Sequence, residues 1–437
     1  MGAAFDPLSK PSGRGAAPTV ADTSRRSAPA GLGTLVHGPP LAVSDLWTNC
    51  GDAAREALAA HFGRTMSPLL PEAEASARFP RGAITSLGDT GLMRARWSEG
   101  GRDRLPLGVV VSEELGRAGL GGIGVGISVH MESVLAVLMR FGRGELLGDY
   151  CEGALDGRLI GCIAASEQNA GSDLGGIQTT AVRHGGGWKI SGTKTNVSLG
   201  GVADFALVLC RVGATANRER GTVTPSLLVA VVPSDSFAIE KRRRPVGARS
   251  LETVQLRVEA DVSDEAVVGR PGRGLMIATW ALTHERLASS AQVIGTMRLA
   301  TSLAATHLYR RRQFGRALIE HQALRLRLAD LAARVSTARH GLYGLTAALS
   351  ASRRDYVRQI AATKVTVARL GERVASECMH LFGAAGYLED ESPLPRLWRD
   401  LRLARLGGGS DEMMLELTAG GLTPDDATYD ALMGRSA

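Results

Sequence analysis

Cysteine and aromatic residues are scarce in this chain of 437 residues. The five cysteines are scattered, odd in number and form no C-x-x-C pair. This usage argues against a disulfide scaffold and against a cysteine-ligated metal site, and it favours free thiols in a reducing compartment. We therefore expect a cytoplasmic protein without a bound metal. Aromatic side chains make up only 4% of the sequence, so the core must be built from Leu, Val, Ala and Met.

Membrane signals are also missing from the sequence. No uninterrupted apolar run approaches the roughly 18 residues of a membrane-spanning helix. Asp6 stands where a myristoylation signal beginning at Met1-Gly2 needs Ser or Thr. We expect no contact with a membrane.

The formal net charge is +7, an excess of basic residues that is compatible with nucleic-acid binding. Arginines gather in one part of the C-terminal half: Arg310, Arg311, Arg312, Arg316, Arg325 and Arg327. The simpler interpretation is an arginine-rich protein that binds acidic cofactors. We favour this second interpretation and do not expect nucleic acid as a partner.

Composition and periodicity divide the chain into five parts. Residues 1–44 are rich in Ala, Gly, Pro and Ser and have no hydrophobic period, which is typical of a disordered tail. Their basic residues also fit a transit peptide, although disorder or a start codon assigned too far upstream explains them as well. Residues 45–159 follow a helical pattern, 160–270 follow the period of strands, 271–420 return to long amphipathic helices, and 421–437 form a C-terminal tail.

The central part predicts a β domain. Alternating or continuous apolar residues predict strands over 187–191, 205–210, 226–232 and 254–258. No long helical pattern separates these strands, so the sheet should be antiparallel, and residues 211–224 should form a loop. The fold class is therefore a multidomain α+β protein with helices, then a sheet, then helices.

One glycine motif resembles a dinucleotide-binding fingerprint. Gly119-Leu120-Gly121-Gly122-Ile123-Gly124 matches G-x-G-x-x-G, which functions only between a strand and a helix. Here the motif follows a helical pattern that ends in glycines. We interpret it as a loop between two helices.

Five short motifs follow one another at characteristic spacing. They are Ser166-Glu167-Gln168-Asn169-Ala170-Gly171-Ser172-Asp173, Gly192-Thr193-Lys194, Arg311-Arg312-Gln313-Phe314-Gly315, Phe382-Gly383-Ala384-Ala385-Gly386-Tyr387 and Gly407-Gly408-Gly409-Ser410-Asp411-Glu412. Together they resemble the acyl-CoA dehydrogenase family of flavoenzymes over roughly residues 80–420. The resemblance implies an N-terminal helical domain, a middle antiparallel, barrel-like β domain and a C-terminal four-helix bundle.

The resemblance also implies a reaction. The family removes the α-proton of an acyl thioester with a carboxylate, while the β-hydrogen leaves as hydride to N5 of FAD. In most members the carboxylate stands where this sequence has Gly408. A minority, similar to the isovaleryl and long-chain enzymes, carries it on an earlier helix directly before an arginine, as Glu285-Arg286 do here.

This placement predicts Glu285 as the base, the Gly408 backbone N–H as an oxyanion donor and Arg286 as a substrate-binding residue. Glu285 shares a helix face with small and mostly apolar residues, which should raise its pKa. The alternative is a solvated helix glutamate paired with Arg286 or another neighbour.

FAD is the cofactor that the resemblance implies. Ser166 and Ser198 match hydroxyls near the flavin ring, Asn196 stands where an aromatic side chain usually stacks on it, and Ser172 matches a pyrophosphate contact. The remaining matches include contacts made to the FAD of a neighbouring subunit: Arg311, Phe314, Gln322, His380, Gly383, Gly386, Ser410 and Glu412. Taken singly, each serine could instead be a turn or a helix cap, and Arg311 a surface charge.

Departures from the family pattern direct the prediction of substrate. Asn196, Gln168 and His380 replace the usual aromatic residue, proline and glutamine, which fits relatives in secondary metabolism that act on carrier-protein thioesters. We expect an acyl thioester of CoA or of a carrier protein as substrate, electron-transfer flavoprotein or oxygen as acceptor, and a homodimer or homotetramer. The alternatives are a flavin monooxygenase on the same fold, which typically lacks the carboxylate, and a flavin-bearing nucleic-acid binder.

Overall fold

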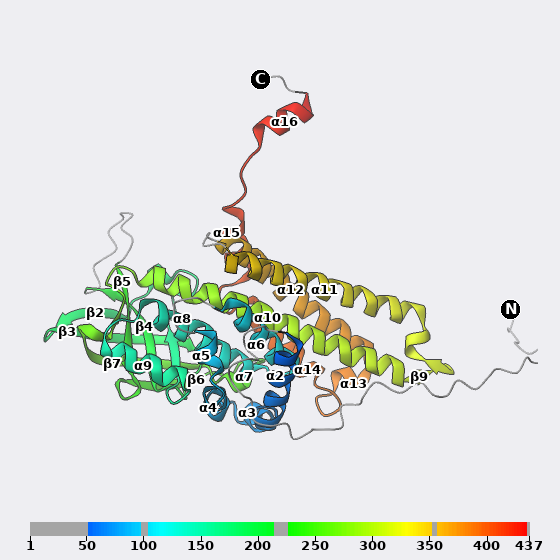
Figure 1. Cartoon of the computed structure of the whole chain (residues 1–437), viewed down its shortest axis with the longest axis horizontal. Coiled ribbons are helices and arrows are strands. Elements are labelled where there is room, and N and C mark those ends of the chain that lie inside the picture. The colour runs from blue at the N-terminus through cyan, green and yellow to red at the C-terminus, as the bar shows by residue number, and fades with distance from the viewer. Residues whose placement is uncertain (1–50, 98–103, 214–225, 352–355, 435–437) are drawn as a thin grey trace, which may run out of the picture. The chain divides into compact units, whose positions relative to one another are not determined.

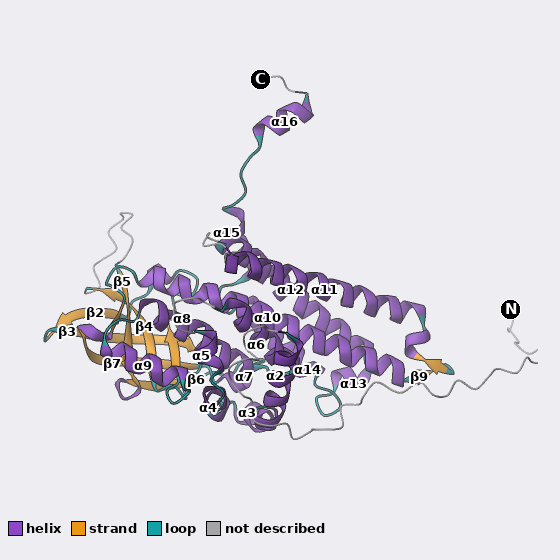
Figure 2. Cartoon of the chain, in the orientation of Figure 1, coloured by secondary structure: helices purple, strands orange, loops and turns teal. Residues whose placement is uncertain are grey.

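The computed structural model describes residues 51–97, 104–213, 226–351 and 356–434. Within these ranges a helical part, a sheet and a second helical part follow one another along the chain, with the strands gathered at one end of the long helices (Figure 1, Figure 2). This order confirms the predicted fold class. The predicted tail over 1–44, Cys50 and most of the predicted loop over 211–224 lie outside the described residues.

The N-terminal part is built from short helices. Their bounds are α2 (Asp52–Thr65), α3 (Leu70–Ser76), α4 (Gly82–Asp89), α5 (Leu92–Arg96), α6 (Leu105–Arg117), α7 (Gly122–Ser128), α8 (Leu135–Phe141) and α9 (Glu145–Leu155). The G-x-G-x-x-G stretch lies at the turn from α6 to α7, so the prediction of a loop between two helices is confirmed. A π-helical segment, Val129–Val134, joins α7 to α8.

The middle part is an eight-stranded sheet in which β1 pairs with β4 beside the path β6-β7-β3-β2-β4-β5-β8. The strands are β1 (Gly161–Ala164), β2 (Thr180–His184), β3 (Gly187–Val197), β4 (Phe205–Val212), β5 (Leu227–Pro233), β6 (Phe237–Arg242), β7 (Val254–Ser263) and β8 (Val267–Val268). Strand β7 alternates buried and exposed residues, whereas Phe205–Cys210 of β4 is buried throughout. An uninterrupted buried run indicates a strand covered on both faces.

Two pairings in this sheet differ from the antiparallel expectation. Strand β1 runs parallel to β4, with Gly161 opposite Phe205, and β2 runs parallel to the last residues of β4. The β2–β3 hairpin and the loop before it separate these strands along the chain, which gives enough length for a parallel crossover without a helix. The other pairings are antiparallel.

The C-terminal part contains three long helices and several short ones. They are α10 (Gly274–Arg310), α11 (Gln322–Ala351), α12 (Val357–Leu381), α13 (Ala384–Tyr387), α14 (Leu394–Arg402), α15 (Asp411–Ala419) and α16 (Asp426–Met433), with the hairpin strands β9 (Arg312–Gln313) and β10 (Arg316–Ala317) between α10 and α11. Helix α16 lies within the predicted tail over 421–437. None of its residues is buried, so no core-facing periodicity marks it in the sequence.

Two hydrophobic cores hold these parts together. The larger core combines the N-terminal helices with the sheet and includes Ile277 and Ala281 from α10. The second core packs α10, α11, α12 and α14 together with Leu105 and Val109 of α6. Because α10 contributes to both cores, this helix connects the sheet with the C-terminal helices.

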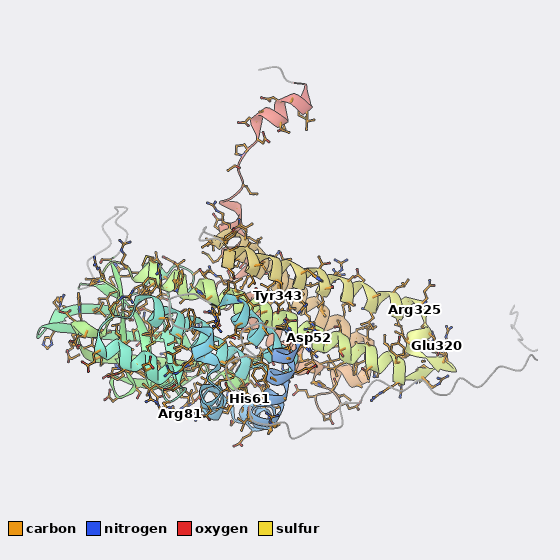
Figure 3. The ribbon with its side chains drawn as sticks, in the orientation of Figure 1. Asp52, His61, Arg81, Glu320, Arg325 and Tyr343 are labelled. Atoms are coloured by element: carbon orange, nitrogen blue, oxygen red, sulfur yellow. The ribbon has the colours of Figure 1, made fainter. Side chains whose placement is uncertain are left out.

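A buried glutamate joins α10 to three other helices. Glu113 of α6 accepts hydrogen bonds from Arg55 of α2, Arg298 of α10, and Arg339 and Tyr343 of α11. Figure 3 labels Tyr343 where α11 meets α2. Burial alone would raise the pKa of Glu113, but these hydrogen bonds and charges outweigh it and lower the pKa to about 2. The cluster therefore binds its carboxylate in the charged form.

One helical stretch passes a length and composition test for a membrane span. The residues Gly122–Phe141 are apolar enough, but 89% of the most apolar window is buried inside the protein. A core helix of this kind passes the same test. Among the described residues it is the single stretch that does so.

Candidate active site

Glu285 lies in the third turn of α10, half-buried in the wall of an internal cavity. The hydroxyl of Ser133, in the π-helical segment, donates to its Oε2 at 3.4 Å. Burial raises the pKa of the Glu285 carboxyl above its ordinary value, and the charges of Arg286 and Lys364 together with the Ser133 hydroxyl oppose this shift. A carboxylate with a raised pKa in a recessed position has the properties of a general base.

Gly408 lies directly against Glu285, although the two residues are far apart in the sequence. A Cβ atom added to Gly408 would stand 3.4 Å from Oε1 of Glu285. Gly408 has a φ of +66° and Gly409 a φ of +107°, which glycine adopts without strain. Family members carry the carboxylate at one of two sequence positions, which here are Glu285 and Gly408. In this structure the two positions lie side by side.

Arg286 contacts the loop that carries Gly408 rather than the cavity. Its Nε donates to the backbone carbonyl of Gly408 at 2.8 Å, and its side chain is buried. The structure therefore gives Arg286 a contact that positions the loop against Glu285. The structure does not show a solvated ion pair between Glu285 and Arg286, because Arg286 directs its Nε to the loop.

Lys364 is a member of the site that sequence reasoning missed. It lies on α12 with 1% of its surface exposed, and its Nζ donates to the carbonyl of Gly409 at 2.5 Å. Burial lowers its pKa to about 8, against the opposing charge of Asp411. Two successive carbonyls, of Gly408 and Gly409, are thus each bound by a buried cationic side chain. The sequence does show a lysine among the apolar residues of a helical pattern. That signal does not reveal that the lysine binds a carbonyl 45 residues away.

The cavity beside Glu285 is framed by α7, α10 and α14. About 100 Å³ of it is open to water-sized molecules. Ser198 lines the same cavity, so the structure brings this predicted cofactor residue close to the predicted base. The lining residues on α10 are Glu285, Ser289, Gln292, Val293 and Thr296.

The first two sequence motifs are joined by a buried ion pair. Nζ of Lys194 donates to Oε1 of Glu167 at 2.8 Å and to the carbonyl of Ala165 at 3.0 Å. Glu167 also accepts hydrogen bonds from the backbone of Gln178 and Thr179. The charge of Lys194 and these hydrogen bonds lower the pKa of Glu167 against the effect of burial. The contacts fix the loop that carries Ser166 and Ser172.

The predicted ring and pyrophosphate residues lie along this loop and the end of β3. Ser166 and Ser198 are half-buried, and Ser172 is exposed. Asn196 is exposed in an irregular part of β3, where the register shifts between Lys194 and Val197, and its φ is +54°. Asparagine adopts this left-handed conformation more readily than the aromatic residue that it replaces.

A second group of predicted residues lies at the other end of α10. Arg311 follows the last residue of α10, and Phe314 stands at the tip of the β9–β10 hairpin with 93% of its surface exposed (Figure 1). Gln322, His380 and Gly383 are exposed near the same end. Glu285 and Arg311 are 26 residues apart along one helix, a separation of roughly 40 Å. The structure therefore does not bring this group to Glu285 within one chain.

Gly386 also has a structural reason for being glycine. A Cβ added there would stand 2.1 Å from the backbone carbonyl of Met379, so the turn after α12 leaves no room for a side chain. Gly383, by contrast, has open space around its Cα and a φ of +63°.

The closing motif ends in a helix cap. Ser410 precedes α15, and its hydroxyl accepts from the backbone N–H of Met413 at 3.5 Å. Glu412 is exposed in the first turn of α15. A cap fits the ordinary alternative for this serine, and the Ser410 side chain also hydrogen-bonds to Glu412.

The residues on the sheet side are chemically suited to a flavin cofactor. The half-buried Ser198 lines the cavity that contains Glu285, and the half-buried Ser166 lies on the loop that the ion pair of Lys194 holds in place. No cluster of metal-ligating side chains occurs among the described residues.

Family models match the three parts of the chain in order. The N-terminal, middle and C-terminal domains of acyl-CoA dehydrogenase match residues 51–158, 162–260 and 272–423. The chain belongs to the acyl-CoA dehydrogenase family. Its activity is accordingly the dehydrogenation of acyl thioesters at a CH–CH bond, and the family generally uses FAD.

Individual relatives agree with this assignment. Acyl-[acyl-carrier-protein] dehydrogenase MbtN of Mycolicibacterium paratuberculosis is 41% identical over 386 residues, which cover 88% of this chain and 97% of the relative. The mitochondrial short-chain specific acyl-CoA dehydrogenase of Bos taurus is 28% identical over 82% of this chain and 86% of its own length. A crystal structure of acyl-CoA dehydrogenase from Geobacillus kaustophilus superposes with a TM-score of 0.78 at 27% identity, covering 85% of this chain and 97% of that chain.

The buried lysine of this dehydrogenase generates a prediction about its closing loop. Lys364→Met removes the donor to the Gly409 carbonyl, and an unsatisfied buried carbonyl costs about 1–3 kcal/mol. We expect hydrogen exchange of the amides at 408–411 to accelerate by up to the corresponding 5- to 150-fold, as measured by exchange mass spectrometry.

Arg369→Met on the same helix is the matched control. Arg369 pairs with Asp411, but its side chain is 48% exposed, and Asp411 keeps Arg405 as a second partner. An exposed pair contributes only about 0–1 kcal/mol, so the exchange should change little. Equal protection of the loop in Lys364→Met and in the unaltered protein would contradict the role of Lys364.

Proposed function

We propose that this protein uses Glu285 to remove the α-proton of an acyl thioester tethered to a carrier protein, with FAD bound between two subunits. The observation that carries the proposal is the convergence of Glu285 and Gly408 on one place beside the cavity. A base is needed there because the α-proton of a thioester is only weakly acidic. FAD, when bound, supplies a ring that accepts the β-hydrogen as hydride.

The residues of the chain divide the remaining work among them. Burial favours the neutral form of Glu285, so this carboxylate accepts a proton readily once the substrate has displaced water. The backbone N–H of Gly408 is the candidate donor to the thioester oxygen, where negative charge develops. Arg286 and Lys364 bind the carbonyls of Gly408 and Gly409 and thereby fix the direction of the loop. For Arg286, we propose this positioning role beside the predicted contact with substrate.

The base generates the sharpest prediction. Glu285→Gln keeps the size of the side chain but cannot accept the α-proton, so it should retain FAD and slow flavin reduction by at least about 10²–10⁴-fold. Because burial raises the pKa of Glu285, flavin reduction in the unaltered protein should increase as the pH rises through a value above the ordinary glutamate pKa. Stopped-flow absorbance of the flavin measures both effects.

The position of Gly408 provides the matching rescue. Glu285→Gly combined with Gly408→Glu should recover part of the lost rate, since the Cβ of a side chain built at 408 stands 3.4 Å from the present Oε1. Recovery should be incomplete, because φ at 408 is +66° and a small misplacement of the base is costly. Near-normal flavin reduction in Glu285→Gln would show that another group is the base.

A second subunit is the natural source of the remaining cofactor contacts. Arg311 lies at the end of α10, roughly 40 Å from Glu285, which is farther than one flavin dinucleotide reaches, and Phe314 and Gln322 follow it in the hairpin and at the start of α11. Their exposure leaves them available to a neighbouring copy. This distance supports a homodimer or homotetramer in which each FAD touches two chains.

Removing Arg311 tests this arrangement. Arg311→Ala deletes a charge-assisted contact to the pyrophosphate, worth on the order of 1.5–3 kcal/mol, so FAD should dissociate about 10- to 150-fold more readily. Cofactor retention after gel filtration, together with the oligomeric state by light scattering, gives the answer. A monomer that holds a full complement of FAD is the result that rejects a site shared between subunits.

The carrier-protein tether rests on two observations. The relative with 41% identity is named for its action on acyl carrier protein, and this chain has a net charge of +7. Carrier proteins are generally acidic, and opposite net charges accelerate encounter at low ionic strength. An acidic carrier protein would therefore be attracted to this chain before it docks.

A comparison of thioesters tests the tether. We expect flavin reduction by the acyl carrier protein to exceed that by the matching acyl-CoA, and to slow as salt rises from about 0.05 to about 0.5 M because the charges are screened. The measurement is the second-order rate constant of flavin bleaching without oxygen. Equal rates for both thioesters, without a salt effect, would instead favour CoA.

The proposal also includes the electron acceptor and the cellular compartment. Electron-transfer flavoprotein or oxygen reoxidises the cofactor, and oxygen consumption distinguishes the two acceptors as well as a monooxygenase. Four buried cysteines, Cys151, Cys162, Cys210 and Cys378, are free thiols, which supports a reducing cytoplasm. Salt-sensitive retention on DNA without thioester-dependent bleaching would favour the nucleic-acid alternative.

A further inference from the structure

The cavity has two ends that can be located from its contacts. At the near end, Glu285 of α10 meets Gly408, and Ser133 donates to Glu285. At the far end, Gln292 of α10 donates to the Gly121 carbonyl at 3.0 Å, and Asp400 of α14 lies beside Gly121. The stretches Gln292 to Glu285, Gly121 to Ser133 and Asp400 to Gly408 thus each lead from the far end of the cavity to the near end.

The length of the cavity follows from the helix that lines it. Its lining residues on α10 extend from Glu285 to Thr296, a separation of eleven residues. At a rise of about 1.5 Å per residue this is roughly 16 Å, and an extended hydrocarbon chain with bonds of about 1.5 Å advances about 1.25 Å per carbon. The space beyond the base therefore accepts about a dozen carbons in extended form.

The far end is closed by an ion pair whose side chains are only 19% (Arg396) and 8% (Asp400) exposed. Nη1 of Arg396 donates to Oδ2 of Asp400 at 2.9 Å, and its Nη2 donates to the Gly119 carbonyl at 2.8 Å. The backbone N–H of Ala248 donates to Oδ1 of Asp400 at 2.6 Å. A Cβ added to Gly121 would stand 2.4 Å from Oδ2 of Asp400, so the loop before α7 packs directly on this pair.

The Arg396–Asp400 pair forms a polar wall between the cavity and a second pocket. On the other side of α14, Arg249, Arg396 and Arg399 line a surface pocket together with Glu74 and Glu389. An apolar chain that passed the wall would have to separate Arg396 from Asp400 and leave charged groups against hydrocarbon. Breaking a buried pair in this way is strongly unfavourable.

From these contacts we infer that the Arg396–Asp400 pair, seated on Gly121 and Ala248, sets an upper limit of about a dozen carbons on the acyl chain. The inference rests on the proposed function, because it takes the cavity beside Glu285 as the acyl site. Arg396 and Asp400 are then specificity-determining residues, and Ser289 is the position from which the limit can be shortened. Ser289 lies one helical turn beyond Glu285 and lines the cavity.

The test uses saturated acyl-pantetheine thioesters of even length, from about 4 to about 18 carbons, whose pantetheine arm is common to both tethers. Binding is measured with Glu285→Gln, which prevents turnover, and flavin reduction with the unaltered holoenzyme. We expect affinity to rise roughly fourfold per methylene up to about a dozen carbons. Beyond this length both affinity and reduction should fall by at least about tenfold for each pair of added carbons.

Substitutions should move the limit in opposite directions. Ser289→Leu, tested with and without Glu285→Gln, should shift the break to about five carbons beyond the α-carbon, because it fills the cavity one turn from the base. Ser289→Ala, which removes the hydroxyl without adding volume, should keep the break where it is. Arg396→Ala combined with Asp400→Ala removes both charges together and should extend the accepted length past about a dozen carbons.

The outcomes distinguish this inference from the proposed function. A break in affinity at about a dozen carbons without any flavin reduction would overturn the dehydrogenase mechanism and keep the length limit. Reduction of all chain lengths at similar rates, or a break that Ser289→Leu does not move, would overturn the limit. If the double alanine variant fails to retain FAD, the Ser289 pair still decides the matter.

Discussion

The hydrogen bond from Arg286 to the carbonyl of Gly408 is the contact on which the rest of this active site depends. It joins residues 122 positions apart, one on a helix that runs through both cores and the other in a glycine loop with left-handed backbone angles. Without that contact, Glu285 and the Gly408 N–H would belong to two independent segments. With it, and with Lys364 on the next carbonyl, the base and the candidate oxyanion donor are held in one rigid arrangement. Preorganised groups of this kind contribute most when charge develops during a reaction.

A buried cationic side chain that binds a loop occurs beside the sheet as well. Lys194 binds Glu167 and the Ala165 carbonyl, and it thereby fixes the loop on which the predicted cofactor serines lie. Arg396 binds Asp400 and the Gly119 carbonyl at the far end of the cavity. Each cation is costly to bury alone and is stable only with its partner in place. The loops around the cavity therefore depend on charged residues from distant helices and strands.

A feature of the fold or the site could be predicted from the sequence only where its signal lies in neighbouring residues. The change of period from helices to strands and back predicted the fold class, and the glycine at 408 together with Glu285-Arg286 predicted where a carboxylate belongs. The parallel pairing of β1 with β4 was missed, because alternation along a strand does not state which neighbour it joins. Lys364 and the Arg396–Asp400 pair were missed for the same reason: their partners are set by packing, and a single charged residue in a helical pattern reveals none of it. The structural reason for Gly386, contact with the Met379 carbonyl, was likewise invisible to a motif.

Helix α10 carries Glu285 in its third turn and delivers Arg311 just past its last residue without an interruption between them. Each residue of such a helix turns the chain by about 100° and advances it by about 1.5 Å. Inserting or deleting one residue anywhere in that stretch would rotate the hairpin that begins at Arg312 by more than a quarter turn relative to the base. The segment can accumulate substitutions during evolution, but its length is fixed, in contrast to the surface loops on either side of it.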